Sequence, residues 1–181
     1  MDRNPFSSAT PALLLTAIVI SAVLNAQTST PGPGPVTSTS PIVFYHLTYL
    51  YDNLATTVAQ RNAADPDLAA SRLQGARNFF GLSNDGYQRL GTVLSSAKVR
   101  MEALLGTQTK LAAGLTNGTA AASANATLQD LYNQQTTLLQ GLPAALQAQL
   151  STADWTALQA FISRELVPNI HVGVINNARP K

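Results

Sequence analysis

The feature that most restricts the fold of this chain is a long run of side chains spaced alternately by three and four residues. Its members are Tyr87, Leu90, Leu94, Ala97, Met101, Leu104, Gln108, Leu111 and Leu115. Because an α-helix turns once in about 3.6 residues, this spacing places all of them along one side of a helix about 42 Å long. An apolar face of this kind is stable in water only when another element covers it. The run therefore predicts an all-α fold with coiled-coil-like packing.

A second run of the same kind follows a break at residues 116–123. It contains Ala124, Leu128, Leu131, Gln135, Leu138 and Leu142. If the chain folds back at the break, the two helices pair in antiparallel fashion, and Gln108 and Gln135 come to the same level. We predict a hydrogen bond between these two amides, since an unpaired buried amide costs about 1–3 kcal/mol. Gly141 and Pro143 predict an interruption after the second run.

Three further helices complete the predicted fold. A helix over 42–63 has an apolar face formed by Phe44, Leu47, Tyr51, Leu54 and Val58. A shorter helix, which Asp65 is expected to cap and Gly81 to end, has an apolar side formed by Leu68, Leu73, Ala76 and Phe80. A last helix, capped by Ser151 and ended by Pro168, has a stripe formed by Trp155, Leu158, Ile162 and Leu166. The sequence thus predicts an antiparallel bundle or hairpin of four to five helices.

Two of the predicted helix starts have the same pattern. "LSNDGYQRL" (82–90) and "LSTADWTAL" (150–158) both read Leu-Ser, three small or polar residues, an aromatic residue, two more residues and Leu. A serine hydroxyl can accept a hydrogen bond from a first-turn amide, so Ser83 and Ser151 are predicted helix caps. Asp154 follows its serine by three residues, which is the spacing of a capping box. The repeat is therefore interpreted as two helix starts.

The stretches "FYHLTYLYDNLA" (44–55), "FFGLSNDGYQRL" (79–90) and "LSTADWTALQAFISRELVPNI" (150–170) occur in an order that resembles small exported, all-helical bacterial proteins of unassigned function. More loosely, the chain resembles the Spy/CpxP group of periplasmic helical proteins, in which two helices begin with Leu-Thr-x-x-Gln. Members of that group form curved antiparallel dimers that bind unfolded or misfolded proteins. This resemblance implies a chaperone-like role. Gly86 and Asp154 occupy the two Gln positions here.

The beginning of the chain has the pattern of a signal peptide. "ALLLTAIVISAVL" (12–24) is apolar but too short to cross a bilayer, which takes about 20 residues. Cleavage is expected after Ala26, with Ala22 as the competing position and an uncleaved anchor as the alternative. The predicted parts are a signal peptide over 1–26, a disordered Pro/Gly/Thr-rich linker over 27–41, a helical domain over 42–172 and a flexible tail over 173–181. The sequence therefore predicts export to the periplasm or out of the cell.

The composition limits the classes of partner. Charged residues make up 11% of the chain and leave a net charge of +2, and no basic cluster exceeds "KVR" at 98–100. Nucleic-acid binding needs a concentrated cationic face, so no nucleic-acid partner is expected. The chain has no cysteine, which excludes disulfides, thiolate metal sites and cysteine nucleophiles. We expect no membrane span once the signal peptide has been removed.

The sequence offers few groups for a catalytic or metal site. Only His46 and His171 supply an imidazole, and neither belongs to a local metal-ligand pattern such as His-Glu-x-x-His. His46 shares a helix with Asp52 and is a candidate ligand or base, although a packing role would account for it as well. We therefore predict that the protein is not an enzyme and has no catalytic residues, no metal-ligating residues and no cofactor.

Two kinds of binding remain. The first is non-enzymatic interaction with a protein client or with a second copy, possible as a homodimer formed through the long seam. The second is a helical bundle that holds a small apolar ligand between its aromatic side chains. These are Tyr45, Tyr49, Tyr51, Phe79, Phe80, Tyr132, Trp155 and Phe161. The first kind is the prediction of this sequence, and the second is the alternative.

Overall fold

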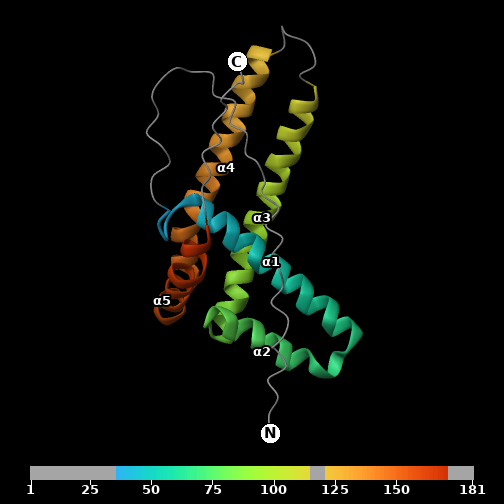
Figure 1. Ribbon diagram of the computed structural model, residues 1–181, viewed down its shortest axis with the longest axis vertical. Coiled ribbons are helices and arrows are strands. Elements are labelled where there is room, and N and C mark those ends of the chain that lie inside the picture. Colours follow the sequence, from blue (N-terminus) through green and yellow to red (C-terminus); the bar gives the residue numbers. More distant parts are fainter. Residues whose placement is uncertain (1–35, 115–120, 171–181) are drawn as a thin grey trace, which may run out of the picture. The chain divides into compact units, whose positions relative to one another are not determined.

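The described part of the chain consists of helices and the short turns between them. The structure is a computed structural model that describes residues 36–114 and 121–170. Its main elements are α1 (Pro41–Ala64), α2 (Ala69–Phe80), α3 (Asn84–Ala113), α4 (Ala121–Gln149) and α5 (Thr152–Phe161) (Figure 1). Three short turns of 3-10 or π-helix are η1 (Pro66–Leu68), η2 (Ile162–Leu166) and η3 (Val167–Asn169). The predicted all-α fold is therefore confirmed for these residues.

Some predictions concern other parts of the chain. The predicted signal peptide, most of the predicted linker, His171 and the predicted tail lie outside the described residues. The last residues of the predicted linker are described, and they form a turn in which the Ser40 N–H donates to the Thr37 carbonyl at 3.0 Å. Val36 packs against the core just before this turn. Of the helices described, none combines the length and the apolar character that a membrane crossing requires.

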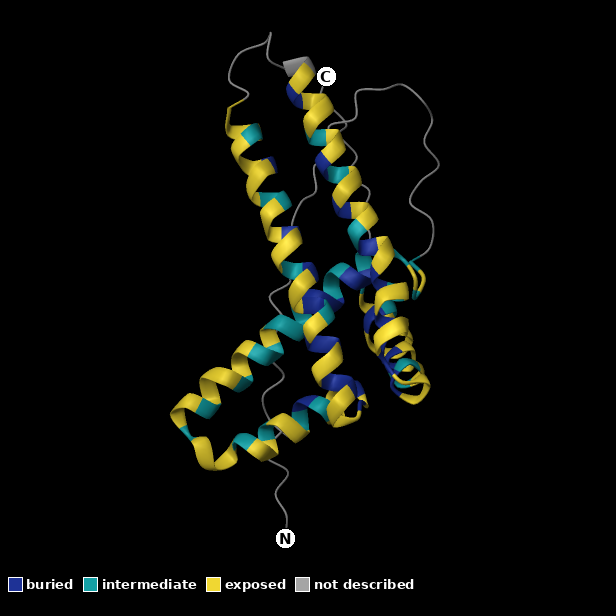
Figure 2. Cartoon of the chain, turned by 180° about the vertical axis from the view of Figure 1, so that it is seen from behind, coloured by how far each residue is buried: buried dark blue, intermediate teal, exposed yellow. Residues whose placement is uncertain are grey.

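The core forms where α1 crosses an antiparallel pair of helices. α3 and α4 run side by side in opposite directions, and α1 contacts both of them (Figure 1). α2 turns back along α1, and α5 folds back at the end of α4. The buried residues in Figure 2 concentrate around this crossing. One continuous cluster results, with members from all five helices: Val43, Phe44, Leu47, Ala76, Phe80, Leu82, Tyr87, Leu90, Leu94, Ala97, Met101, Leu139, Leu142, Leu146, Leu150, Leu158, Phe161, Ile162 and Leu166.

The predicted interruption at Gly141 and Pro143 is wrong, because α4 runs through both residues without a break. A proline inside a helix removes one backbone hydrogen bond and costs about 3 kcal/mol. In α4 the residues on either side of Pro143 are core residues, since Leu139, Leu142 and Leu146 are each at most 6% exposed. Burial of a leucine side chain contributes about 1.5–3 kcal/mol, so these three residues together outweigh the cost of the proline.

The predicted seam between α3 and α4 is largely confirmed, but the predicted amide pair is not. Met101 is fully buried, and both Gln108 and Gln135 are buried as the spacing requires. Among the described residues no hydrogen bond joins Gln108 and Gln135, and the buried Gln108 Nε2 has no partner there. The two amides lie outside the main core cluster, toward the end of the pair that α1 does not cross.

The start of the second helix differs from the prediction. Asp65 precedes a 3-10 turn, and its side chain makes no capping bond. Leu68 and Leu73, which were expected on the buried side, are 50% and 39% exposed. Only Ala76 and Phe80 of the predicted apolar side are buried. The 3-10 turn shifts the face that α2 presents to α1, since a 3-10 helix has only about three residues per turn.

Arg72 holds the turn between α1 and α2. Its Nη1 donates to the carbonyls of Arg61 at 2.8 Å and Asp65 at 2.6 Å, and its Nη2 pairs with the Asp65 carboxylate at 3.2 Å. The guanidinium thus adds hydrogen bonds to a carbonyl in the last turn of α1 and to the carbonyl of the residue after the helix, and it places a positive charge at the negative end of the helix dipole.

Replacing Arg72 with alanine is therefore expected to lower the free energy of unfolding by about 1.5–2 kcal/mol, because two charge-assisted bonds to backbone carbonyls are lost, one of them part-buried. Chemical denaturation measures the change. Arg61→Ala is the matched control, since it removes an exposed guanidinium but keeps the Arg61 carbonyl that Arg72 binds. Equal effects of the two substitutions would contradict this role for Arg72.

The two Leu-Ser helix starts meet in the folded chain at one carboxylate. Ser83 and Ser151 cap α3 and α5 as predicted, accepting bonds from the N–H groups of Gly86 at 3.0 Å and Asp154 at 3.1 Å. The Asp154 carboxylate accepts the backbone N–H of Ser83 at 2.7 Å, the Ser83 hydroxyl at 2.9 Å and the Ser151 hydroxyl at 2.7 Å. One side chain thus completes the starts of two helices. We refer to Ser83, Gly86, Ser151 and Asp154 as the Asp154 junction.

The charge state of Asp154 follows from these contacts. Asp154 is only 7% exposed, and burial by itself raises the pKa of a carboxyl. The hydrogen bonds from the Ser83 N–H and from the Ser151 and Ser83 hydroxyls favour the charged form more strongly, so the pKa of Asp154 lies below its ordinary value. The carboxylate is therefore ionised at neutral pH and fully occupied by its structural partners.

Gly86 leaves the space that this carboxylate fills. A Cβ atom at Gly86 would lie 2.6 and 2.7 Å from the two carboxylate oxygens of Asp154, which is closer than real Cβ contacts. This close approach explains why the residue three positions after Ser83 is a glycine. Asp154, which belongs to the second helix start, accepts hydrogen bonds from both helix starts.

Candidate interaction surface

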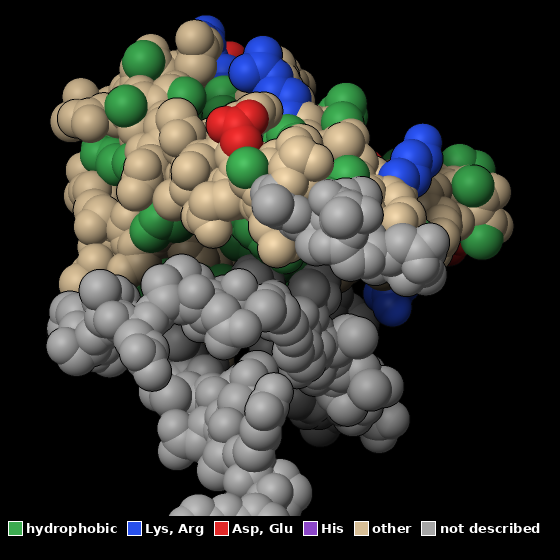
Figure 3. Space-filling model, turned by 90° about the horizontal axis from the view of Figure 1, so that it is seen from above, with side chains coloured by type: hydrophobic (Ala, Val, Ile, Leu, Met, Phe, Trp, Pro, Cys, Tyr) green, Lys and Arg blue, Asp and Glu red, His purple; other side chains and the backbone are tan. Residues whose placement is uncertain are grey.

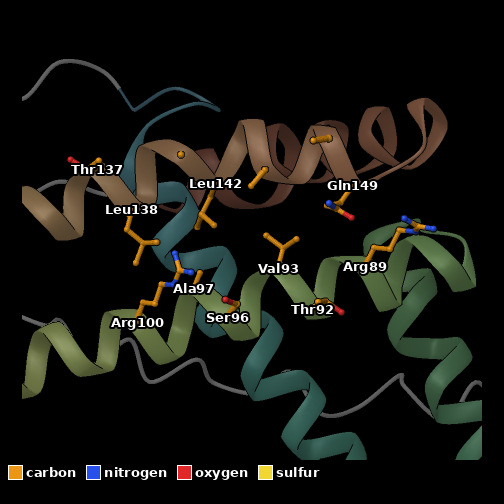
Figure 4. A pocket seen from close by; sticks show the side chains of 13 residues that line it. Arg89, Thr92, Val93, Ser96, Ala97, Arg100, Thr137, Leu138, Leu142 and Gln149 are labelled. Carbon is orange, nitrogen blue, oxygen red and sulfur yellow. The ribbon is translucent and has the colours of Figure 1, made fainter.

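A groove runs between α3 and α4 on a face to which no other described helix contributes. It has a volume of about 620 Å³. Its lining comes from α3 and α4 alone: Arg89, Thr92, Val93, Ser96, Ala97, Arg100, Thr137, Leu138, Gly141, Leu142, Ala145, Ala148 and Gln149. Figure 4 shows Val93, Leu138 and Leu142 directed into the space between the two helices. The face is therefore open along the helix pair.

The groove has an apolar floor and small walls. Ala97 and Leu142 are buried at its base, and Val93 and Leu138 are half-buried above them. Most of the exposed residues along the walls are small, namely Thr92, Ser96, Thr137, Gly141, Ala145 and Ala148, and the larger ones are Arg89, Arg100 and Gln149. Small side chains let the backbone of another helix approach closely. The small walls therefore favour close approach of another chain segment to the backbones of α3 and α4.

The charged residues of the lining are all positive. Arg89 and Arg100 lie at the two ends of the α3 wall, and Arg100 extends toward α4 while Arg89 lies across from Gln149 (Figure 4). The α4 wall carries no charge. On the face of the molecule that Figure 3 shows, charged side chains are few, and hydrophobic side chains are scattered among the backbone and other side chains. Two guanidinium groups on one apolar groove are therefore a distinct electrostatic feature.

The spacing of the groove residues can be found in the sequence, although the stronger apolar pattern of the seam lies directly beside it. On α3 the lining residues follow one another at intervals of three and one, as do most of those on α4, which is the spacing of one helical face beside the seam. Most seam residues are large and apolar, whereas most residues that only the groove lining contains are small or polar. Gly141, which suggested a helix break, instead widens the groove, since no atom lies within 4 Å of the position that its Cβ would take.

The candidate residues of the sequence do not form a catalytic group. The Asp52 carboxylate pairs with the Lys98 ammonium at 3.2 Å, which ties α1 to α3, and Lys98 also pairs with Glu102 at 3.1 Å. His46 is half-buried on α1 with its ring edge-on to Tyr45, at 5.8 Å between centroids. Burial lowers the pKa of His46, so its imidazole is neutral at pH 7. His46 and Asp52 thus have different partners and do not interact with each other.

The aromatic side chains pack largely on one another. The centroid of the Phe80 ring lies 4.9 Å from the centroid of the Phe161 ring and 6.2 Å from the ring centroids of Tyr51 and Tyr87. Burial, the charge of Tyr51 and the hydrogen bond with Tyr51 raise the pKa of Tyr87 to about 12. These residues thus form a neutral aromatic part of the core, with rings that meet edge-on or tilted.

Metal ligation and similarity to known proteins give no further assignment. Within residues 36–114 and 121–170, no three His, Asp or Glu side chains come close enough to hold a metal ion. No protein-family model, curated protein or solved structure matches the chain.

Proposed function

We propose that this protein is an exported, non-enzymatic binding module that holds apolar segments of other proteins in the groove between α3 and α4. The observation that supports the proposal is the open apolar floor formed by Val93, Ala97, Leu138 and Leu142 on a face that no other described helix contributes to. Export is inferred from the pattern of residues 1–26. The proposal needs no catalytic group and no cofactor.

The form of the groove favours a protein segment as occupant. A site for a small molecule usually encloses most of the surface of its ligand, whereas this groove is open along two helices. A helix laid into a groove between two others is a common mode of protein recognition, with apolar residues at intervals of three and four inserted between the walls. The small residues on both walls leave room for those side chains.

Filling the groove tests the proposal. Gly141→Leu places a large side chain among the lining residues, at a position where the added Cβ has no atom within 4 Å. Leucine also has the higher helix propensity, by roughly 0.5–1 kcal/mol, so the variant is expected to fold at least as stably as the original. We expect it to weaken binding of a fluorescent amphipathic helical peptide with a leucine stripe and no charges at least tenfold, as measured by fluorescence anisotropy.

Gly106→Leu is the matched control. Gly106 lies on α3, is exposed and likewise has no atom within 4 Å of its would-be Cβ, but it does not line the groove. The two substitutions add the same group to equally open helical positions and should raise the melting temperature similarly. Equal peptide affinity of the two variants, or no binding by the unaltered protein, would overturn the proposal.

A further inference from the structure

From the charges of the groove we infer that its partner is an amphipathic helix carrying two carboxylates on one face, about three helical turns apart. This inference rests on the proposed function and adds the chemical class of the partner. Its basis is the placement of Arg89 and Arg100 at the two ends of an apolar floor.

The spacing of the two arginines sets the spacing of the partner's acids. Arg89 and Arg100 are eleven residues apart on a continuous helix, which is about 16 Å along its axis. Eleven residues also complete three turns to within about 20°, so both side chains leave the same face of α3. A partner helix that lies along the groove meets both guanidinium groups when its own acids are eleven residues apart, in either direction of the chain.

The charges of the groove are not balanced from within. No lining residue is acidic, and Arg100 makes no ion pair with any other residue of the described ranges. Arg89 pairs with Asp85 at 2.7 Å, but that carboxylate is 71% exposed and lies on the first turn of the same helix. An exposed pair of this kind is weak, and Arg89 can exchange it for a carboxylate of the partner. The groove thus has positive charge available for a partner.

The same charges disfavour a second copy as the occupant. A two-fold axis through the groove would set two identical surfaces against each other. Both surfaces would carry Arg89 and Arg100, and neither surface has an acidic residue in its lining. Like charges would therefore meet. α4 offers no compensation, since Asp130 is its one charged residue and lies outside the lining. The charge pattern therefore suits a different, acidic partner.

Four helical peptides test the inference. All four share one leucine stripe and differ in two residues next to that stripe. The matched peptide has glutamates eleven residues apart, and the opposed peptide has them nine residues apart and hence on opposite sides of the helix. The lysine peptide and the glutamine peptide have those residues at the two positions of the matched peptide. We expect the matched peptide to bind the intact protein about threefold more tightly than the glutamine peptide and about tenfold more tightly than the lysine peptide. The opposed peptide should gain little over the glutamine peptide, and added salt should remove the differences.

Reversing one charge of the groove provides the second test. Arg100→Glu should weaken the matched peptide about tenfold and improve binding of the lysine peptide, while the glutamine peptide is little affected. Lys110→Glu is the matched control, because it makes the same charge change on an exposed residue of α3 outside the groove. The control separates a local contact from the effect of net charge.

The possible outcomes distinguish this inference from the proposed function. Equal affinity for all four peptides, or equal effects of Arg100→Glu and Lys110→Glu, would overturn the inference and leave the binding groove in place. Failure of every peptide to bind would overturn both. A dimer in sedimentation that Gly141→Leu dissociates would assign the groove to a second copy and overturn the acidic partner.

Discussion

Replacing Asp154 with alanine is expected to lower the free energy of unfolding by about 3 kcal/mol, which corresponds to roughly 10 °C in melting temperature for a domain of this size. The carboxylate accepts three hydrogen bonds from the starts of α3 and α5 and is almost completely buried. Its removal leaves the Ser83 N–H without its acceptor and takes the negative charge away from two helix N-termini. Thermal and chemical denaturation of the purified domain measure the change.

Asp85→Ala is the matched control for this substitution. Asp85 also lies in the first turn of α3, but it is 71% exposed and pairs only with Arg89. Loss of an exposed first-turn acid costs at most about 1 kcal/mol. A similar loss for both variants would mean that the Asp154 junction contributes no more than an ordinary helix start.

The pH dependence of stability gives an independent check on Asp154. Its pKa is lowered in the folded state, so the unfolded chain binds the proton more readily. The stabilisation is therefore complete above the pKa of the unfolded chain and is lost as the pH falls through that value and then through the folded pKa. In Asp154→Ala this contribution is absent, and the difference in stability between the two proteins should shrink on acidification. A constant difference from neutral to strongly acidic pH would contradict the assignment.

Gly86→Ala is expected to destabilise the protein by about 2 kcal/mol, although the same change in an open helix normally stabilises by about 1 kcal/mol. The sign reverses because the added methyl group would overlap the Asp154 carboxylate. In the Asp154→Ala background that overlap disappears, and Gly86→Ala should then be neutral or stabilising. A double-mutant cycle by chemical denaturation should give a coupling free energy of about 2–3 kcal/mol.

Gly106→Ala serves as the control for this cycle. The position is helical and open, so the substitution should stabilise the protein equally with and without Asp154. Additive behaviour of Gly86→Ala and Asp154→Ala would show that the two residues do not share one space. A destabilising effect of Gly86→Ala that persists without Asp154 would locate the clash elsewhere.

The positions of the helices and most of the core could be predicted from the sequence, because they depend on local signals. Ser83 and Ser151 cap the helices that follow them, and Gly81 ends α2 with the positive φ of 72° that favours glycine. The alternating spacing placed Leu90, Leu94 and Met101 correctly in the core, since a helix repeats its faces with a fixed period. These features require no knowledge of how the helices pack.

The remaining features depend on contacts between distant parts of the chain. Pro143 reads locally as a helix break, and only the burial of its neighbours against α1 and α3 shows why the helix continues. Asp154 has the spacing of a capping box, but spacing cannot show that the N–H it binds belongs to Ser83. The groove was missed for the same reason. Its walls are ordinary small residues until α3 and α4 lie side by side with nothing from α1 between them.

The Asp154 junction also bears on the order in which the domain is completed. The acceptor for the Ser83 N–H lies 71 residues further along the chain, so α3 lacks part of its start until the last helix has been synthesised. Contacts of such separation carry a large loop-closure entropy and form late in folding. A nascent chain that ends just after α4 has the two longest described helices but not the bond that joins the first of them to α5. Completion of the Asp154 junction therefore requires α5, and the start of α3 gains the carboxylate as an acceptor only when α5 reaches Ser83.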